Sequence, residues 1–288
     1  MSSLSLPVAA LAAASHLAPN LVAPFFRRLM LVPRRHVRPP PVLVMPEAEE
    51  RLTLGNGLVA WRWGDDHPAV PRVLLVHGFE GNRRQFGALL EALLERGLCV
   101  VALDVPAHGQ SAGDELTAVT FVAAIDRALD QLGPFRAVVG HSMGGAMSLF
   151  SVARRGRAQR LALVSAPSSL GRELKRFAKA VGLSKRGTAA FIASVEHHVG
   201  RPAADFDVRR IAGQVNLPLL MVHDQTDRQV PVAEAARSAH ILRGAELIVT
   251  RGLGHNRLLA DPAVVRAITD FVAPESAGQE MTGSVSIS

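Results

Sequence analysis

One short stretch, Gly140-His141-Ser142-Met143-Gly144, constrains the fold of this chain more than any other. It lies between an apolar run at 135–139, typical of a buried strand, and a run at 146–153 that favours a helix. A serine on so tight a turn takes a strained backbone conformation, and bulky residues in place of the two glycines would clash. The pattern predicts that Ser142 exposes its hydroxyl at the carboxyl end of a strand, beside the free N–H groups of a helix N-terminus.

Strand and helix patterns alternate along most of the chain. Apolar runs typical of buried strands lie at 73–76, 98–103, 160–165, 218–223 and 246–250. Helical patterns are interspersed at 85–96, 117–132, 231–242 and 262–272, and an Asn-Gly turn predicts a preceding hairpin over 52–63. This alternation predicts an α/β protein with a doubly wound, mostly parallel sheet, helices on both faces, and reactive groups at the carboxyl ends of the strands.

Length and charge narrow the class of protein. The 288 residues suffice for one large α/β domain with a small insertion, and Cys99, the only cysteine, is predicted to be a buried strand residue. The net charge of +7 is concentrated in two regions. Residues 1–48 carry five arginines against one glutamate, and residues 168–214 carry nine basic against four acidic side chains. No nucleic-acid-binding motif accompanies this charge, so nucleic acid is not predicted as a partner.

Residues 1–48 are predicted to form an N-terminal helical segment and a linker, extended at 38–41. The run from Leu6 to Leu17 is apolar, lacks the basic start of a signal peptide and is too short to span a bilayer. Two interpretations stay open, namely a helix packed on the main domain or an interfacial anchor flanked by arginines. We expect a cytoplasmic protein, with secretion or membrane-surface contact as alternatives. The small, polar tail at 274–288 is predicted to be disordered.

Four predicted strand ends carry residues of compatible chemistry. Ser142 follows one strand and the loop His77-Gly78-Phe79 another, while Asp224 and Asp227 follow a third and His255 a fourth. A serine hydroxyl is a poor nucleophile until a base accepts its proton, and a carboxylate orients that base. The order along the chain predicts Ser142 as the nucleophile and His255 as the base, with one of the two aspartates as the acid.

These motifs resemble those of the α/β-hydrolase superfamily across about residues 49–273. The resemblance rests on the His77-Gly78 loop, the GHSMGG turn, Asp227 within HDQTDRQVP, and His255. The segment 104–111 is similar to a DxPAHGxS turn found in compact bacterial hydrolases.

The resemblance implies a role for each residue of the site. In the family, Val-Pro usually follows the acid by three residues, as Val230-Pro231 follows Asp227, so Asp227 is the implied acid and Asp224 orders its loop. The backbone N–H groups of Phe79 and Met143 form the implied oxyanion hole.

The other histidines are predicted to have structural tasks. His77 and His108 would order loops, and His141 would pack beside the turn, pointing away from the nucleophile. His197-His198 and His223 have no carboxylate at metal-ligand spacing on a helix. Neither a metal nor another cofactor is therefore predicted.

Residues 168–214 interrupt the alternation and are predicted to form a small helical cap between strands six and seven. One helical face would be apolar, with Leu170, Leu174, Phe177 and Val181. Another would be basic, with Arg172, Lys175, Arg176 and Lys179. This basic face is either solvated or attracts an anionic substrate or a membrane surface.

Together these features predict a cofactor-independent serine hydrolase that cleaves a small-molecule ester or thioester through an acyl-enzyme. A peptidase, lyase or perhydrolase using the same three residues is the enzymatic alternative. A catalytically silent binding protein with this fold is the alternative of another class. The sequence predicts neither the acyl or alcohol group of the substrate nor the oligomeric state.

Overall fold

A computed structural model describes residues 6–34, 46 and 50–273 of the chain. The predictions of an extended linker at 38–41 and of a disordered tail at 274–288 therefore lie outside the described residues.

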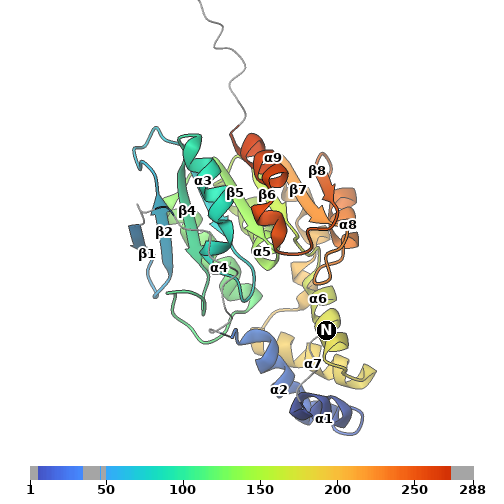
Figure 1. The fold of residues 1–288 in the computed structure, drawn as a ribbon. Helices are drawn as coiled ribbons and strands as arrows, with labels where there is room; N and C mark the ends of the chain where they lie inside the picture. The colour runs from blue at the N-terminus through green and yellow to red at the C-terminus, as the bar shows by residue number, and fades with distance from the viewer. Residues whose placement is uncertain (1–5, 35–45, 47–49, 274–288) are drawn as a thin grey trace, which may run out of the picture.

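An eight-stranded sheet forms the centre of the molecule (Figure 1), in the order β1-β2-β4-β3-β5-β6-β7-β8. The hairpin β1 (Glu50–Thr53) and β2 (Val59–Trp63) is antiparallel, and β2 pairs antiparallel with β4. The other strands are parallel: β3 (Arg72–Val76), β4 (Cys99–Asp104), β5 (Ala137–His141), β6 (Leu161–Val164), β7 (Leu219–Asp224) and β8 (Glu246–Thr250). The predicted mostly parallel α/β sheet is confirmed.

Helices cover both faces of this sheet, which makes it doubly wound. One face carries α3 (Gly87–Glu95) and α9 (Pro262–Val272), whose apolar residues pack on the sheet around Leu89 and Ile268. The other carries α4 (Ala118–Leu132), α5 (Met143–Arg155) and α8 (Ala233–Ile241), packed around Phe121 and Met147. The helix predicted at 85–96 instead begins with a 3₁₀ turn, Arg83–Phe86, capped by the Asn82 side chain.

Four helices form a separate layer beyond the carboxyl ends of the strands (Figure 1). We call it the helical lobe, and it comprises α1 (Leu6–Ala14), α2 (Pro19–Leu31), α6 (Leu170–Ala180) and α7 (Lys185–Val199). Short 3₁₀ turns at Ala203–Phe206, Val208–Arg210 and Ala212–Gln214 lead back to β7. The lobe has its own apolar core, in which Phe26 packs with Leu174 and Phe191.

The N-terminal segment thus forms two helices where one was expected, and α2 packs on α7 of the insertion instead of on the sheet. The reason is the apolar face of α2, which includes Val22 and Phe26 and meets the buried side of α7 at Phe191 and Val195. None of the described helices combines the length and the apolar character needed to cross a bilayer.

Candidate active site

The turn after β5 has the strained geometry that its residues predict. Ser142 has φ 54° and ψ −128°, a conformation that non-glycine residues rarely adopt. A Cβ atom on Gly144 would come 2.4 Å from the carbonyl oxygens of Val76 and His77, so only glycine fits there. The close approach of β3 to the turn therefore requires this glycine, and it leaves Ser142 partly exposed at the N-terminus of α5.

A buried hydrogen bond joins the two other residues predicted for the site. His255 Nδ1 donates to Asp227 Oδ2 at 2.7 Å, and both side chains are almost fully buried. Burial alone would raise the pKa of Asp227, but the His223 ring, whose Nε2 lies 3.5 Å from Asp227 Oδ2, and the hydrogen bond from His255 outweigh it and hold that pKa well below its usual value. Asp227 is therefore ionised, and it holds His255 in the tautomer whose Nε2 is free to accept a proton.

Asp224 organises the loop that carries His255. Its two carboxylate oxygens accept five hydrogen bonds, from Thr226 N–H and its hydroxyl, the Thr250 hydroxyl, and the N–H groups of Leu253 and Gly254. Although burial opposes ionisation, these bonds keep the pKa of Asp224 far below its usual value. Asp224 thus connects the end of β7 to the loop that carries His255. Of the two aspartates, Asp227 is the one that is hydrogen-bonded to the His255 ring.

The loop after β3 lies directly against the nucleophile turn. A Cβ atom on Gly78 would meet the Cβ of Ser142 at 2.8 Å, so the backbone next to Phe79 runs along Ser142. The Phe79 N–H makes no hydrogen bond within the described residues. The Met143 N–H lies in the first turn of α5, where no intrahelical acceptor exists. The N–H groups of Phe79 and Met143 thus belong to two segments that meet at Ser142, where the predicted oxyanion hole would form.

Two histidines and one ion pair hold the loop that contains Phe79. His77 Nδ1 donates to the Gly78 carbonyl at 2.8 Å, and burial lowers the pKa of His77 to about 3, so the ring is neutral. Glu80, at φ 55°, donates its N–H to His108 Nε2 at 2.8 Å. Its carboxylate accepts two hydrogen bonds from the Arg34 guanidinium, at 2.8 and 2.9 Å. The segment that follows α2 is thereby attached to the loop of Phe79.

His141 has a role that the sequence did not indicate. Its Nε2 donates to the backbone carbonyl of His255 at 2.9 Å, and its Nδ1 lies 3.1 Å from the amide nitrogen of Gln85. Burial lowers the pKa of His141 to about 3, which keeps the ring neutral. His141 was predicted to point away from the nucleophile and to pack beside the turn. Its hydrogen bond to the His255 carbonyl could not be predicted, because that carbonyl lies far along the chain.

Asp104 is buried at the end of β4. The Trp61 indole N–H and the Gln110 N–H both donate to its Oδ2, at 2.9 Å each. A Cβ atom on Gly109 would overlap this carboxylate at 2.3 Å. Asp104 therefore orders the DxPAHGxS turn at 104–111, in which Ser111 also donates to the Asp104 carbonyl.

Within the described residues, no hydrogen bond joins the Ser142 hydroxyl to His255. Serine–histidine contacts of this kind often reach hydrogen-bond length only when substrate is bound. The chemistry open to this arrangement is nucleophilic attack by Ser142, with His255 as proton acceptor and two backbone donors beside the reacting oxygen.

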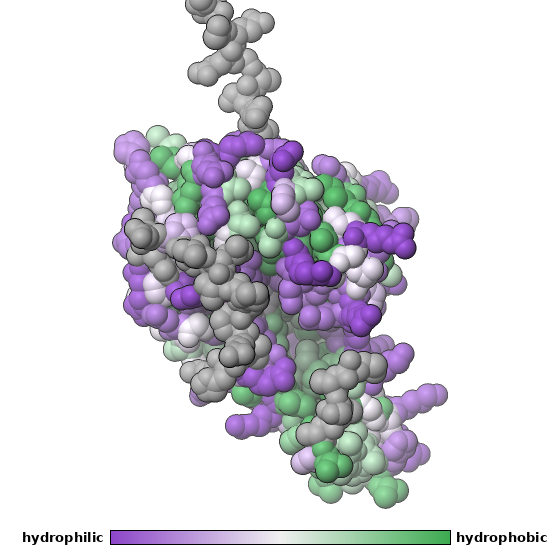
Figure 2. Space-filling model, viewed as in Figure 1, coloured by the Kyte–Doolittle hydropathy of each residue, from purple (hydrophilic) through white to green (hydrophobic). Residues whose placement is uncertain are grey.

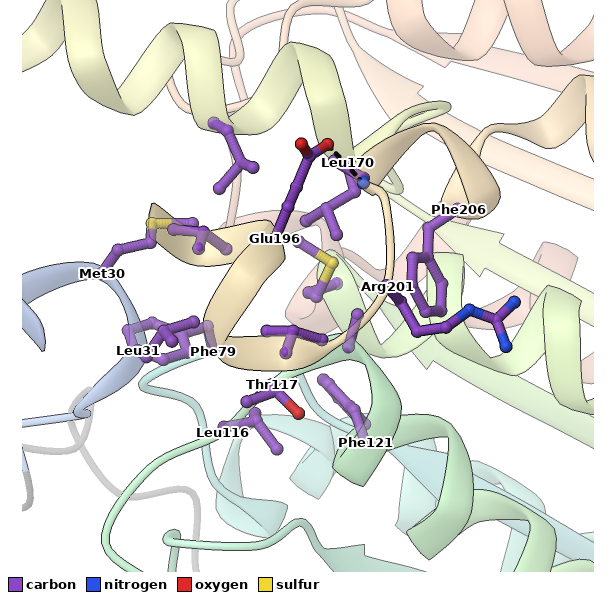
Figure 3. A pocket seen from close by; sticks show the side chains of 16 residues that line it. Met30, Leu31, Phe79, Leu116, Thr117, Phe121, Leu170, Glu196, Arg201 and Phe206 are labelled. Carbon is purple, nitrogen blue, oxygen red and sulfur yellow. Dashed lines mark hydrogen bonds between the residues drawn. The ribbon is translucent and has the colours of Figure 1, made fainter. Parts of the chain in front are cut away.

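An apolar cavity begins at Phe79 and Met143 and extends into the helical lobe (Figure 3). Its other walls come from α2, α4, α6, α7 and the turn before β7, through residues such as Leu31, Phe121, Leu174, Val199 and Phe206. Its volume is only about 50 Å³. The Arg201 side chain extends away from it and pairs with Asp205, and Glu196 accepts the Ala203 N–H, so neither charge is offered to the cavity.

The basic face predicted on α6 is partly neutralised. Arg172 pairs with Glu234 of α8 at 3.0 Å, and Arg176 pairs with Glu173. Lys175 and Lys179 are exposed and make no ion pair with a described acidic side chain. The sequence could not indicate this difference, because Glu234 lies more than 50 residues away from α6 along the chain.

Two further histidines, His223 and His198, lie apart from each other and bind different partners. His223 Nε2 donates to the Val230 carbonyl at 2.8 Å, and His198 contacts Glu115 at the surface. No group of three or more His, Cys, Asp or Glu side chains within the described residues is arranged to hold a metal ion.

Comparison with known families identifies the class of protein. Residues 71–197 match the family described as "alpha/beta hydrolase fold", and residues 199–280 match the one described as "TAP-like protein". The chain belongs to the α/β-hydrolase superfamily, as its motifs suggested.

Curated relatives match only locally. A "Putative non-heme haloperoxidase" of Mycobacterium phage D29 is 33% identical over 90 residues, which cover 28% of this chain and 31% of the relative. The "Dihydrolipoyllysine-residue acetyltransferase component of acetoin cleaving system" of Cupriavidus necator is 44% identical over 82 residues, covering 26% of this chain and 21% of the relative. The matched stretches thus span less than a third of either relative.

Solved structures share the fold at low identity. The "Thioesterase Domain From Curacin Biosynthetic Pathway" has TM-score 0.58 and 19% identity, covering 80% of this chain and 99% of that one. A "membrane phospholipase A, a novel bacterial virulence factor" has TM-score 0.60 and 18% identity, with 93% and 95% covered. At this level of identity the likeness shows a shared fold.

Proposed function

We propose that this protein is a cofactor-independent serine hydrolase that cleaves a carboxylic ester or thioester with an apolar acyl group. The observation that carries the proposal is the 2.7 Å hydrogen bond between His255 and Asp227, at the same sheet edge as the strained Ser142 turn. Ser142, His255 and Asp227 then act as nucleophile, base and orienting acid.

The reaction proceeds in two halves. The Ser142 hydroxyl gives its proton to His255 Nε2 while its oxygen attacks the carbonyl carbon, and the resulting oxyanion accepts hydrogen bonds from Phe79 N–H and Met143 N–H. His255 then returns the proton to the departing alcohol or thiol, which leaves an acyl-enzyme. A water molecule repeats the sequence, with His255 again as base, and releases the acid.

The cavity supports an apolar acyl group. It starts at the two residues of the proposed oxyanion hole and has no charged group directed into it. Peptide or other polar groups would lose hydration there without finding partners, which disfavours a peptidase. Because its volume is about 50 Å³, a longer acyl chain requires the lobe helices to move apart. Relatives described as a thioesterase domain and a phospholipase agree with this substrate class.

Labelling with a fluorophosphonate probe tests the nucleophile. We expect wild type to be labelled and Ser142→Ala to remain unlabelled, with Ser111→Ala, a serine of the turn at 104–111, as the control that keeps labelling. Absence of labelling in folded wild type would favour a silent binding protein. A panel of p-nitrophenyl and acyl-CoA esters of increasing chain length then separates esters from thioesters and tests the apolar cavity. A preference for acetyl over every longer acyl group contradicts the assignment of the cavity.

A further inference from the structure

The outer face of the N-terminal helices exposes apolar side chains that no helix or strand of the described residues covers. Five of the seven large hydrophobic side chains that are exposed among the described residues lie in the N-terminal segment 6–34. Four of them recur every fourth residue: Leu17, Leu21, Phe25 and Leu29, with exposed fractions of 93%, 82%, 40% and 39%. Leu21, Phe25 and Leu29 lie on one side of α2, away from Phe26, which is completely buried in the lobe core, and Leu17 precedes them in the turn between α1 and α2.

These four residues, the α2 stripe, leave much of their apolar surface exposed, although the Phe25 ring also packs edge-on against Phe26. The inner face of α2 already supplies the contacts that hold it to the lobe. Figure 2 shows apolar surface gathered at this end of the molecule, with hydrophilic residues around it. Large contiguous apolar surface of this kind marks a binding face in monomeric proteins.

Cations without acidic partners surround the stripe. Residues 6–34 contain no acidic residue; of their three arginines, Arg34 pairs with Glu80, whereas Arg28 is exposed on α2 between Phe25 and Leu29 in the sequence. At the turn between α1 and α2, the Ser184 N–H donates to the Ser15 hydroxyl at 3.0 Å. Lys185 and Arg186, the two residues that follow Ser184, are exposed at this end of α7.

None of Arg28, Lys185 and Arg186 forms an ion pair with a described acidic side chain. A second copy of the chain would bring the same cations against this face and would be repelled. An anionic lipid surface supplies both an apolar layer for the stripe and negative charge for its rim, and a helix of this length can lie within the interface.

We propose that the outer face of α1 and α2 docks on anionic lipid bilayers, with the α2 stripe in the headgroup boundary and Arg28, Lys185 and Arg186 against lipid phosphates. The opposite side of α2 carries Met30 and Leu31, which line the apolar cavity. Docking therefore places the cavity next to the bilayer. The proposal concerns binding alone and stands independently of the hydrolase activity.

Sedimentation with lipid vesicles tests the proposal on the full chain. We expect wild type to bind vesicles of equal parts phosphatidylglycerol and phosphatidylcholine, and to bind pure phosphatidylcholine far less. Leu21→Gln/Phe25→Gln should weaken binding about tenfold or more, because two apolar side chains leave the interface. Lys185→Gln/Arg186→Gln should weaken it about 20-fold at low salt, and raised salt should weaken wild type similarly.

Matched variants on the main domain separate this surface from general effects. Val249→Gln removes another exposed apolar side chain, and Arg243→Gln/Arg251→Gln removes two exposed cations. We expect both to bind like wild type, and all variants to unfold at the wild-type temperature. The proposal is wrong if wild type does not bind anionic vesicles. It is also wrong if the matched variants weaken vesicle binding as much as the variants of the stripe and its cations. A wild-type dimer in sedimentation velocity that Leu21→Gln/Phe25→Gln dissociates, without vesicle binding, assigns the stripe to a second copy and also overturns it.

Discussion

The turn at Ser142 and the helical lobe beyond the strand ends are packed in different ways. At the turn, backbone from β3, β5 and α5 meets so closely that a single methyl group on Gly144 would overlap two carbonyl oxygens at 2.4 Å. In the lobe, side chains make the contacts, and a Cβ on Gly171 of α6 would find its nearest neighbour, the Ser169 hydroxyl, at 3.8 Å. Rigid geometry thus lies where the reaction is proposed, and adaptable apolar packing lies where the substrate chain is proposed to bind.

The largest expected effect is on catalysis, and it concerns the two aspartates that follow β7. Asp227→Asn removes the acceptor that fixes the His255 tautomer, and we expect kcat to fall about 10⁴-fold while the fold persists. Asp224→Asn places an amide N–H₂ among five donors, which should lower the free energy of unfolding by about 1–3 kcal/mol. Ester hydrolysis and urea unfolding of both variants measure this. A greater loss of kcat in Asp224→Asn would reassign the acid.

Paired glycine substitutions test the contrast in packing directly. Gly144→Ala should destabilise the protein by about 3 kcal/mol or more, because the opposing atoms are backbone and cannot move aside. Gly171→Ala, in an open helical position, should be neutral or stabilising by about 0.5–1 kcal/mol. Urea unfolding gives both values. Similar destabilisation by the two substitutions would show that the turn is no more tightly packed than the lobe.

Lowering the pH should reduce the free energy of unfolding through the buried histidines at the carboxyl ends of the strands. The pKa of His141 is about 3 in the folded protein against about 6.5 when unfolded, so the unfolded state binds more protons between these values. The free energy of unfolding should therefore fall as pH drops from 6.5, by at most about 1.4 kcal/mol per pH unit for this residue. His141→Asn should flatten the pH dependence between 6.5 and 4.5, measured by urea unfolding. An unchanged slope would contradict a buried, neutral His141.

The smallest effect concerns the link between the two regions. Arg34→Ala frees Glu80, next to the proposed oxyanion donor Phe79, and we expect kcat to fall about two- to fivefold, as an exposed ion pair allows. Arg209→Ala breaks another arginine–carboxylate pair, with the buried Asp207 inside the cap, and should leave kcat unchanged. Steady-state kinetics on a soluble ester compare the two. Equal effects would mean that Arg34 has no specific role in positioning the loop.

Much of the sheet and of the candidate site could be predicted because the signals are local. The Asn-Gly hairpin, the buried strand runs and the Gly140–Gly144 turn each reflect residues close together in the chain, and the structure has the corresponding elements. The contacts of His141 with the His255 carbonyl and of Arg172 with Glu234 could not be predicted in this way. They join residues whose separation along the chain leaves no periodic pattern.

The sequence by itself determined the alternation of strands and helices, and with it that Ser142, the two aspartates and His255 each follow a strand, because backbone preferences and hydrophobic periodicity act over a few residues. Tertiary structure alone decided that the N-terminal helices pack on the inserted cap, that Arg34 reaches the Glu80 carboxylate, and that α2 turns one face to a cavity and the other to solvent. The physical reason is that apolar surface can be buried against any complementary face, and only the folded chain shows which face is available.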